Sequence, residues 1–162
     1  MVAKVIWGNK EMIEIDRKNL QKAYEHLESA LSLLKDLKIK SFVSRFYYGI
    51  LWFLNGIFKN LTGGKWHERK RYEKVFDESE HAILGKIWEY FKALRFVADY
   101  GYYQGKSWSE YEEKFWEEAP EKVEQFLDYL RSLEDETLEI ILIKEKAEEI
   151  RIWLTLISNV KK

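Results

Sequence analysis

The chain has 162 residues, a length typical of one domain, and 46% of them are apolar and 16% aromatic. Its formal net charge of −1 excludes a molecule-wide basic field for nucleic acid, so any such site must be local. The sequence holds no Cys, which excludes disulfides and thiolate metal sites and fits a reducing cytoplasm. We expect no signal peptide, no membrane association, no metal and no other cofactor. The abundance of Lys and Glu is typical of heat-adapted proteins.

The first part of the chain predicts a hairpin followed by a helix. Two β-prone runs on either side of Gly8-Asn9 predict a β-hairpin over residues 1–15. Asp16 then stands where a helix N-cap should be. Apolar residues recur at a spacing of three and four from Leu20 to Leu37, which predicts an amphipathic helix.

The middle of the chain predicts two further helices. Residues 41–60 are apolar on nearly every side of a helix, as expected for the central helix of a bundle. Residues 65–76 form a charged connector. Ser79 is then a candidate N-cap for a third helix that reaches Tyr100.

The C-terminal third predicts a helix and then strands. Ser109 and Glu112 have the spacing of a capping box that opens a fourth helix. Pro120 lies inside this helix and predicts a kink or a restart. Residues 137–158 alternate with a period of two and are rich in β-branched side chains, which predicts a second hairpin. The expected fold is therefore mainly α, an up-and-down helical bundle over residues 16–133, with two terminal hairpins that can join into a small sheet.

Two short motifs carry a resemblance to a known superfamily. The first is Arg45-Phe46-Tyr47-Tyr48 in the second predicted helix, and the other runs from Arg95 to Gly101 in the third. Their order resembles the HEPN superfamily, in particular its small prokaryotic branch with an Arg-x-Tyr-Tyr helix and a later Arg-x-x-x-Asp-Tyr segment. The resemblance covers residues 16–133. It implies a homodimeric bundle of four or five helices, often encoded beside a nucleotidyltransferase in toxin–antitoxin pairs.

The resemblance also implies an activity, and here the sequence departs from the pattern. Active members are metal-independent ribonucleases that use an Arg, four to six residues and then a His, assembled across the dimer. In this chain the expected His positions hold Tyr100, Gly101 and Tyr102, and no His follows His81. An ordinary phenol has a pKa of about 10 and is ionised to roughly one part in a thousand at pH 7. Such a group is therefore a poor replacement for His in proton transfer.

The two arginines of the motifs each have a structural and a functional interpretation. Arg45 stands in an otherwise apolar helix, and a buried Arg must be paired or bind an anion. It therefore either pairs with Asp99 or Glu89, or belongs to an anion site. Tyr48 lies on the same helix face. Arg95 and Asp99, four residues apart, form either a simple intrahelical ion pair or a phosphate clamp in which Asp99 holds the guanidinium.

The aromatic and basic segments also have two interpretations each. Tyr100, Tyr102 and Tyr103 either pack against the next helix or stack on nucleic-acid bases. By the resemblance, Tyr102 takes the place of a Tyr that a partner nucleotidyltransferase adenylylates in some members. Residues 65–74 are either a solvated connector or a basic surface for phosphates. The candidates in this segment are Lys65, Arg69, Arg71 and His67, which matches a His of this HEPN branch.

Three hypotheses for function follow. The first is a HEPN-like RNA- or nucleotide-binding module that dimerises, partners a nucleotidyltransferase and holds its ligand in a cleft lined by Arg45, His67, Arg95 and Tyr100. The second is an active ribonuclease toxin that uses His67 or Tyr100 for proton transfer. The third is a non-catalytic structural subunit.

Overall fold

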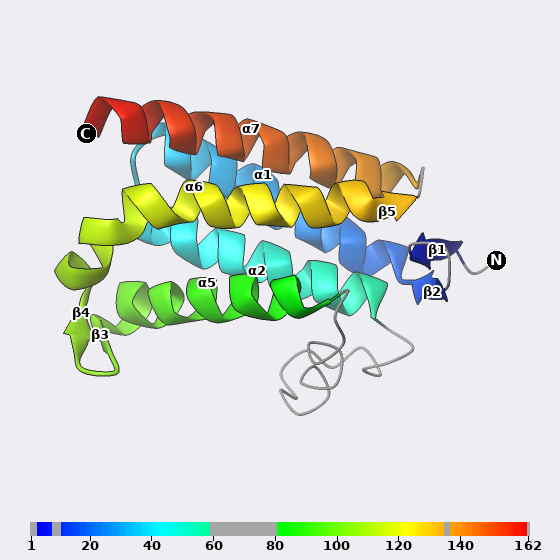
Figure 1. The fold of residues 1–162 in the computed structure, drawn as a ribbon, viewed down its shortest axis with the longest axis horizontal. Helices are drawn as coiled ribbons and strands as arrows, with labels where there is room; N and C mark the ends of the chain where they lie inside the picture. The colour runs from blue at the N-terminus through cyan, green and yellow to red at the C-terminus, as the bar shows by residue number, and fades with distance from the viewer. Residues whose placement is uncertain (1–2, 8–10, 59–80, 135–136, 162) are drawn as a thin grey trace.

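The computed structural model describes residues 3–7, 11–58, 81–134 and 137–161. Most of them belong to five helices, α1 (Arg17–Lys35), α2 (Ile39–Ile57), α5 (Ala82–Tyr100), α6 (Trp108–Ser132) and α7 (Leu138–Lys161). Helix α1 packs against α2 and α7, α2 against α5, α5 against α6, and α6 against α7. The helices thus form a closed ring of neighbours in an elongated bundle (Figure 1). The predicted mainly α bundle is confirmed.

Helix α1 forms as the sequence predicts. The Asp16 carboxylate accepts hydrogen bonds from the backbone N–H groups of Lys18, at 3.1 Å, and Asn19, at 3.3 Å. This caps the first turn, whose N–H groups have no partner within the helix. The buried stripe of α1 consists of Leu20, Ala23, Leu27, Ala30, Leu31 and Leu34.

Helix α2 is the central helix of the bundle. Phenylalanine rings supply much of its buried surface, and Phe46 packs against Phe91 of α5 and Phe126 of α6, with ring centroids 4.5 and 6.1 Å apart. The side of α2 that faces α1 carries Gly49 and Gly56, seven residues apart. These glycines let the two helices approach closely, because a Cβ atom at either position would meet a leucine of α1 within 3 Å.

Helix α6 begins earlier than predicted and continues through its proline. The capping box consists of Ser107 and Glu110, not Ser109 and Glu112, because the helix starts at Trp108. The Glu110 carboxylate accepts the Ser107 N–H at 3.1 Å. Pro120 lies within one continuous helix, so no restart occurs, and the first turns lie at an angle to the rest (Figure 1).

A contact from α7 explains how α6 accommodates Pro120. Proline has no N–H to donate to the carbonyl four residues earlier, which is that of Trp116. The Ser158 hydroxyl of α7 donates to this carbonyl at 2.6 Å, and Ser158 is only 4% exposed. The orphaned acceptor is therefore satisfied by a neighbouring helix rather than by α6 itself.

The predicted hairpin over residues 137–158 is wrong, because this segment forms helix α7. Its buried residues recur at helical spacing: Ile140, Ile143, Ala147, Ile150, Leu154 and Ser158. The outer side of α7 also carries large apolar residues, Leu138, Ile152, Leu156 and Val160 among them. Apolar residues on both sides conceal the helical period in the sequence, and packing against α1 and α6 selects the helix.

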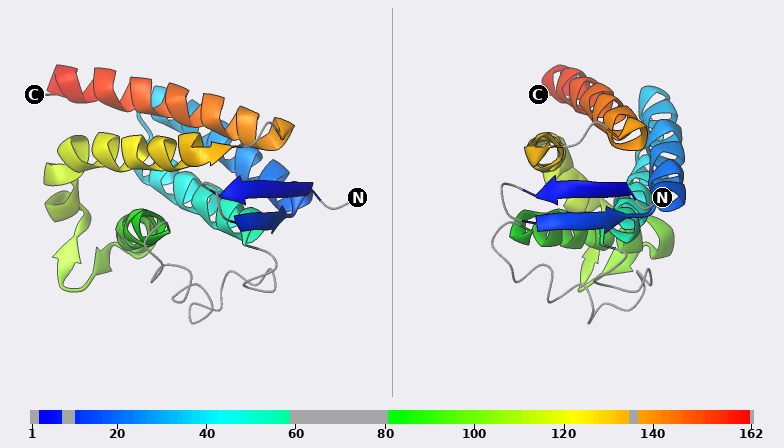
Figure 2. Two further views of the ribbon diagram at one scale, coloured as in Figure 1. Left: turned by 45° about the vertical axis from the view of Figure 1, so that its right-hand side comes forward. Right: turned by 90° about the vertical axis from the view of Figure 1, so that its right-hand side faces the viewer.

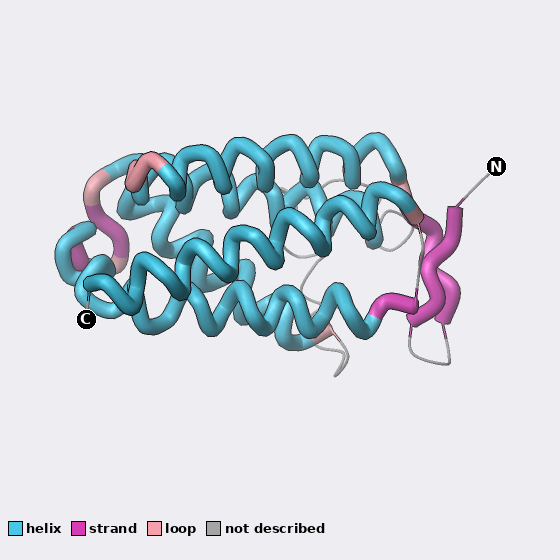
Figure 3. Tube along the Cα trace, turned by 90° about the horizontal axis from the view of Figure 1, so that it is seen from above, coloured by secondary structure: helices cyan, strands magenta, loops and turns pink. Residues whose placement is uncertain are grey.

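The predicted N-terminal hairpin is confirmed and belongs to a small sheet. Strand β1 (Ala3–Trp7) pairs antiparallel with β2 (Glu11–Ile15), and its end pairs antiparallel with β5 (Leu133–Glu134). The third strand thus comes from the end of α6, not from a second hairpin. The sheet lies across one end of the bundle (Figures 2 and 3). A two-stranded ribbon, β3 (Tyr102–Tyr103) and β4 (Lys106–Ser107), joins α5 to α6.

Among the helices that the structure describes, none combines the length and the apolar character that crossing a membrane requires.

Candidate functional site

A pocket of about 350 Å³ lies between the start of α2 and the end of α5. Both helix ends are at the end of the bundle opposite the sheet (Figure 1). The pocket is formed by Leu33, Lys40, Ser41, Ser44, Arg45, Ala98 and Asp99. We call it the α2–α5 pocket. It brings Arg45 and Asp99, two residues that the sequence singled out, into one site.

Arg45 is exposed, which corrects the expectation of a buried arginine. Helix α2 keeps one narrow solvent-facing stripe, and Arg45 lies on it between Ser41 and Tyr48. Neither Asp99 nor Glu89 pairs with Arg45, and it forms no ion pair with any residue that the structure describes. Its guanidinium therefore lies at the pocket with its charge uncompensated by a neighbouring carboxylate.

The partner of Arg45 is His26 of α1, whose Nδ1 atom lies 3.4 Å from the Arg45 Nη1 atom. A guanidinium can only donate hydrogen bonds, so Nδ1 must be the unprotonated nitrogen of a neutral imidazole. Burial, and then the positive charge of Arg45, lower the pKa of His26 below its ordinary value of 6.5. Both observations indicate a neutral His26 at neutral pH, with a lone pair directed at the arginine.

Arg95 is held in place on α5 by three kinds of contact. Its Nε atom lies 3.2 Å from Asp99 Oδ2, an ion pair without hydrogen-bond geometry, and its Nη2 atom donates to the Tyr48 hydroxyl at 2.9 Å. The guanidinium also lies over the rings of Tyr47, Tyr48 and Phe96, with centroid distances of 5.2 to 5.5 Å. The predicted intrahelical pair of Arg95 and Asp99 is confirmed. The side chain is only 18% exposed, whereas Arg45 is exposed.

Tyr48 connects the two arginines. Its hydroxyl accepts from Arg95, and its ring lies beside His26, with centroids 5.8 Å apart. His26 in turn contacts Arg45. A continuous chain of contacts therefore runs across α5, α2 and α1, and Asp99 at one end of it lines the same pocket as Arg45 at the other.

The balance of charge at the α2–α5 pocket favours an anion. Lys40 and Arg45 line it together with one carboxylate, Asp99, and this carboxylate is already paired with Arg95. Two serine hydroxyls, from Ser41 and Ser44, complete the polar lining. Hydroxyl and guanidinium donors at one place are the groups with which proteins bind phosphate.

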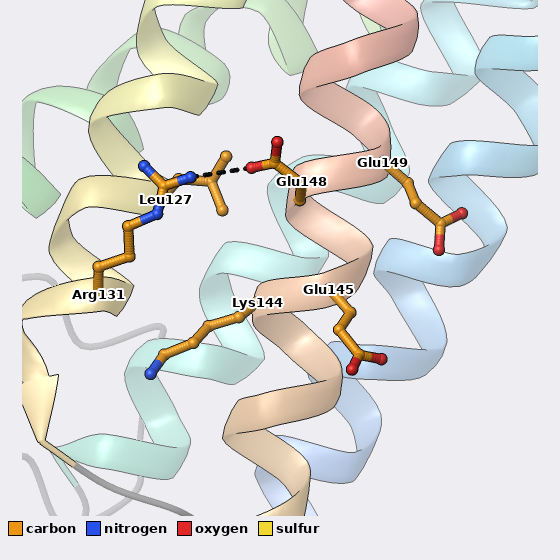
Figure 4. A pocket seen from close by; sticks show the side chains of 6 residues that line it. All are labelled: Leu127, Arg131, Lys144, Glu145, Glu148 and Glu149. Carbon is orange, nitrogen blue, oxygen red and sulfur yellow. Dashed lines mark hydrogen bonds and ion pairs between the residues drawn. The ribbon is translucent and has the colours of Figure 1, made fainter.

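Two other pockets have the opposite balance. A pocket of about 530 Å³ between α6 and α7 is lined by Leu127, Arg131, Lys144, Glu145, Glu148 and Glu149 (Figure 4). Its Arg131 already donates to Glu148 at 2.9 Å. A third pocket, of about 620 Å³ beside the β3–β4 ribbon, has two lysines and three glutamates in its lining. Carboxylates outnumber cations in both, so neither suits an anion.

The remaining predicted residues lie elsewhere. Tyr100 and Tyr102 are 67% and 65% exposed and are not among the residues that line the α2–α5 pocket. Tyr103 stacks on Phe96, which belongs to the preceding helix α5 and not to the next helix that the structural interpretation named. Four further candidates lie outside the described residues: Lys65, His67, Arg69 and Arg71.

Sequence reasoning missed His26, Lys40, Ser41 and Ser44. His26 is one of three histidines in the chain and lies at the edge of the buried stripe of α1, a position that is also typical of a structural histidine. Its contact with Arg45 joins residues 19 positions apart on different helices. No spacing within a single helix indicates such a contact.

These features define a class of protein: a mainly α helical bundle with a positively charged pocket between two of its helices. No family model matches the chain, and no solved structure matches it. The chain is 28% identical over 159 residues to "Uncharacterized protein MJ0427" of Methanocaldococcus jannaschii. The similarity covers 91% of this chain and 95% of that protein, so it extends over nearly the whole length of both.

Proposed function

We propose that this protein is a HEPN-like RNA- or nucleotide-binding module that holds a phosphate group in the α2–α5 pocket. The observation that carries the proposal is the exposed guanidinium of Arg45, which has no carboxylate partner among the described residues and shares the pocket with Lys40 and two serines. The planar guanidinium fork can donate two parallel hydrogen bonds to two oxygens of a phosphate. A charge that only faces solvent would not require this geometry.

The rest of the proposal draws on the resemblance between the Arg45 and Arg95 segments and the HEPN pattern. As such a module, the protein forms a homodimer and interacts with a nucleotidyltransferase in a toxin–antitoxin-type pair. The contacts of Arg95 support the resemblance, because the guanidinium joins the Asp99 of its own motif to the Tyr48 of the other. The two motifs are therefore in direct contact, as one site built from both would require.

The proposal is tested by measuring the binding of a labelled RNA oligonucleotide and of ATP to wild-type protein and to Arg45→Gln. A charge-assisted hydrogen bond contributes about 1.5–3 kcal/mol, so the variant should bind roughly 10- to 150-fold more weakly. The dependence of binding on salt concentration should also become shallower, by a slope of about one. Arg131→Gln, which removes an exposed Arg that is already paired on α6, is the matched control.

Equal binding by wild-type protein and Arg45→Gln would refute the site. If the wild-type protein binds neither RNA nor nucleotide, the structural-subunit hypothesis takes its place.

A second candidate function, metal-independent RNA cleavage, is favoured by His26. A neutral imidazole beside an arginine is the pair of groups that 2′-hydroxyl attack needs. In this proposal Arg45 turns from His26 Nδ1 to the phosphate and stabilises the negative charge that develops there, and the Nδ1 lone pair that it releases accepts the 2′-hydroxyl proton. The 2′-oxygen bonds to phosphorus, the bond to the 5′-oxygen breaks, and the leaving 5′-oxygen takes up the proton that His26 accepted, directly or through water. In this proposal His26 takes the role that the sequence offered to His67 or Tyr100.

Incubating the protein with RNA in excess chelator tests this second candidate. Cleavage that is lost in His26→Gln, while RNA binding persists, would support the enzyme. Absence of cleavage by the wild-type protein, or full cleavage by His26→Gln, would refute the role of His26.

A further inference from the structure

Two tyrosine side chains beside the end of α5 are mostly exposed to solvent, unlike the aromatic residues in the core of the bundle. Tyr100 and Tyr102 are 67% and 65% exposed, on either side of Gly101. Gly101 has a φ of +82° and closes the helix, donating its N–H to the Val97 carbonyl at 2.7 Å. Apart from its two chain neighbours, no residue places an atom within 4 Å of the position that a Cβ of Gly101 would take. The turn thus leaves no other residue packed against Gly101.

The Tyr100 ring contacts a second aromatic ring of α5. Phe96, one turn earlier on α5, lies 5.7 Å from the Tyr100 ring and 5.3 Å from the Tyr103 ring, with the latter stacked at 18°. The Arg95 guanidinium lies over Phe96 as well, at 5.5 Å. The Tyr100 ring is thus in contact with Phe96, at an angle of 39°, and is otherwise open toward solvent. A ring restrained by a neighbour loses less conformational freedom on binding than a free one.

This aromatic surface adjoins the α2–α5 pocket. Ala98 and Asp99 line the pocket and directly precede Tyr100 in the chain. Arg95 contacts Asp99 on the pocket side and Phe96 on the aromatic side. The cationic pocket and Tyr100 therefore lie close to each other at the end of α5.

We infer that the exposed rings of Tyr100 and Tyr102 stack on unpaired bases, so that the ligand of this surface is single-stranded RNA rather than duplex RNA or phosphate alone. The inference rests on the proposed function, because it takes the phosphate-binding pocket as the site of the backbone. Bases within a duplex have their faces covered by neighbouring base pairs, whereas a single strand can turn its bases onto protein rings. Every base can stack on an aromatic ring, so this surface should prefer single-stranded over duplex RNA without preferring a particular base sequence.

The experiment compares the binding of a fluorescein-labelled single-stranded uridine oligonucleotide, the same strand in a duplex, and inorganic phosphate as competitor. Tyr100→Ala and Tyr102→Ala should each bind the single strand about 5- to 150-fold more weakly. Tyr100→Phe and Tyr102→Phe, which keep the ring and lose the hydroxyl, should bind it as the wild type does. The alanine variants should leave competition by phosphate unchanged, and thermal unfolding should confirm that they are folded.

The outcomes separate the inference from the proposed function. If both alanine variants bind the single strand as the wild type does while Arg45→Gln binds weakly, the stacking surface is wrong and the phosphate site stands. The stacking surface is equally wrong if the duplex binds as tightly as the single strand. If the wild-type protein binds no single strand, or Arg45→Gln has no effect, the proposed function fails as well.

Discussion

We expect the Ser158 hydroxyl to stabilise the fold through the hydrogen bond that it donates to the Trp116 carbonyl. In Ser158→Ala the Trp116 carbonyl loses the donor that lies 2.6 Å from it, and Pro120 has no N–H to replace that donor. A buried acceptor left without a partner costs about 1–3 kcal/mol. Because Ser158 is 4% exposed and Ala is nearly as large, little packing is lost and this cost is the whole expected effect.

The cause is isolated by a double-mutant cycle with Pro120→Ala. Alanine at position 120 restores the N–H that the Trp116 carbonyl would accept in an ordinary helix, so Ser158→Ala should then cost less than about 1 kcal/mol. The free energy of unfolding is measured by urea titration for all four proteins. Ser29→Ala, at an exposed position on α1, is the control and should change stability by no more than about 0.5 kcal/mol.

Equal costs of Ser158→Ala in the presence and in the absence of the Pro120→Ala substitution would refute this reasoning. They would show that Ser158 stabilises the protein by some route other than the carbonyl that proline leaves without a donor.

Three further predictions concern packing and titration. Gly49→Ala should destabilise the fold by about 1–3 kcal/mol, because its Cβ would lie 2.7 Å from Leu27 Cδ2, and by less in a Leu27→Ala background; urea titration measures both. Arg45→Gln should raise the pKa of His26 toward 6.5 in an NMR titration, because one cause of its lowered pKa is removed; an unchanged pKa would contradict the contact. Hydrogen bonding to Arg151 lowers the pKa of Glu148. The ionised carboxylate should therefore stabilise the fold above its ordinary pKa of 4.5, and this stabilisation should be lost as pH falls through the lowered pKa. The difference in the free energy of unfolding between wild type and Glu148→Gln, measured by urea titration, should shrink in acid.

The candidate site was only partly predictable from the sequence. The residues Arg45, Tyr48, Arg95 and Asp99 stand in two recognisable segments, and the pairing of Arg95 with Asp99 follows from their spacing on one helix. The exposure of Arg45 does not follow from its apolar surroundings in the chain. Which side of a helix meets solvent depends on where its neighbouring helices pack, and α2 is covered on every side but one narrow stripe.

The sequence alone determined those features whose cause lies within a few residues. Asp16 caps α1, two β-prone runs form the strands β1 and β2 of the N-terminal hairpin, and the apolar stripe of α1 forms its helix. Local spacing is sufficient for these, because hydrogen bonds and burial repeat with the period of the element.

Only the tertiary structure decided the features that join distant segments. Helix α7 replaces an expected hairpin because α1 and α6 offer it a surface to bury its inner side. Helix α6 continues through Pro120 because a hydroxyl 42 residues away supplies a donor for Trp116. His26 meets Arg45 because two helices cross there. In each case the deciding partner lies on another element, and the sequence pattern of one element does not show which residue of another element it will meet.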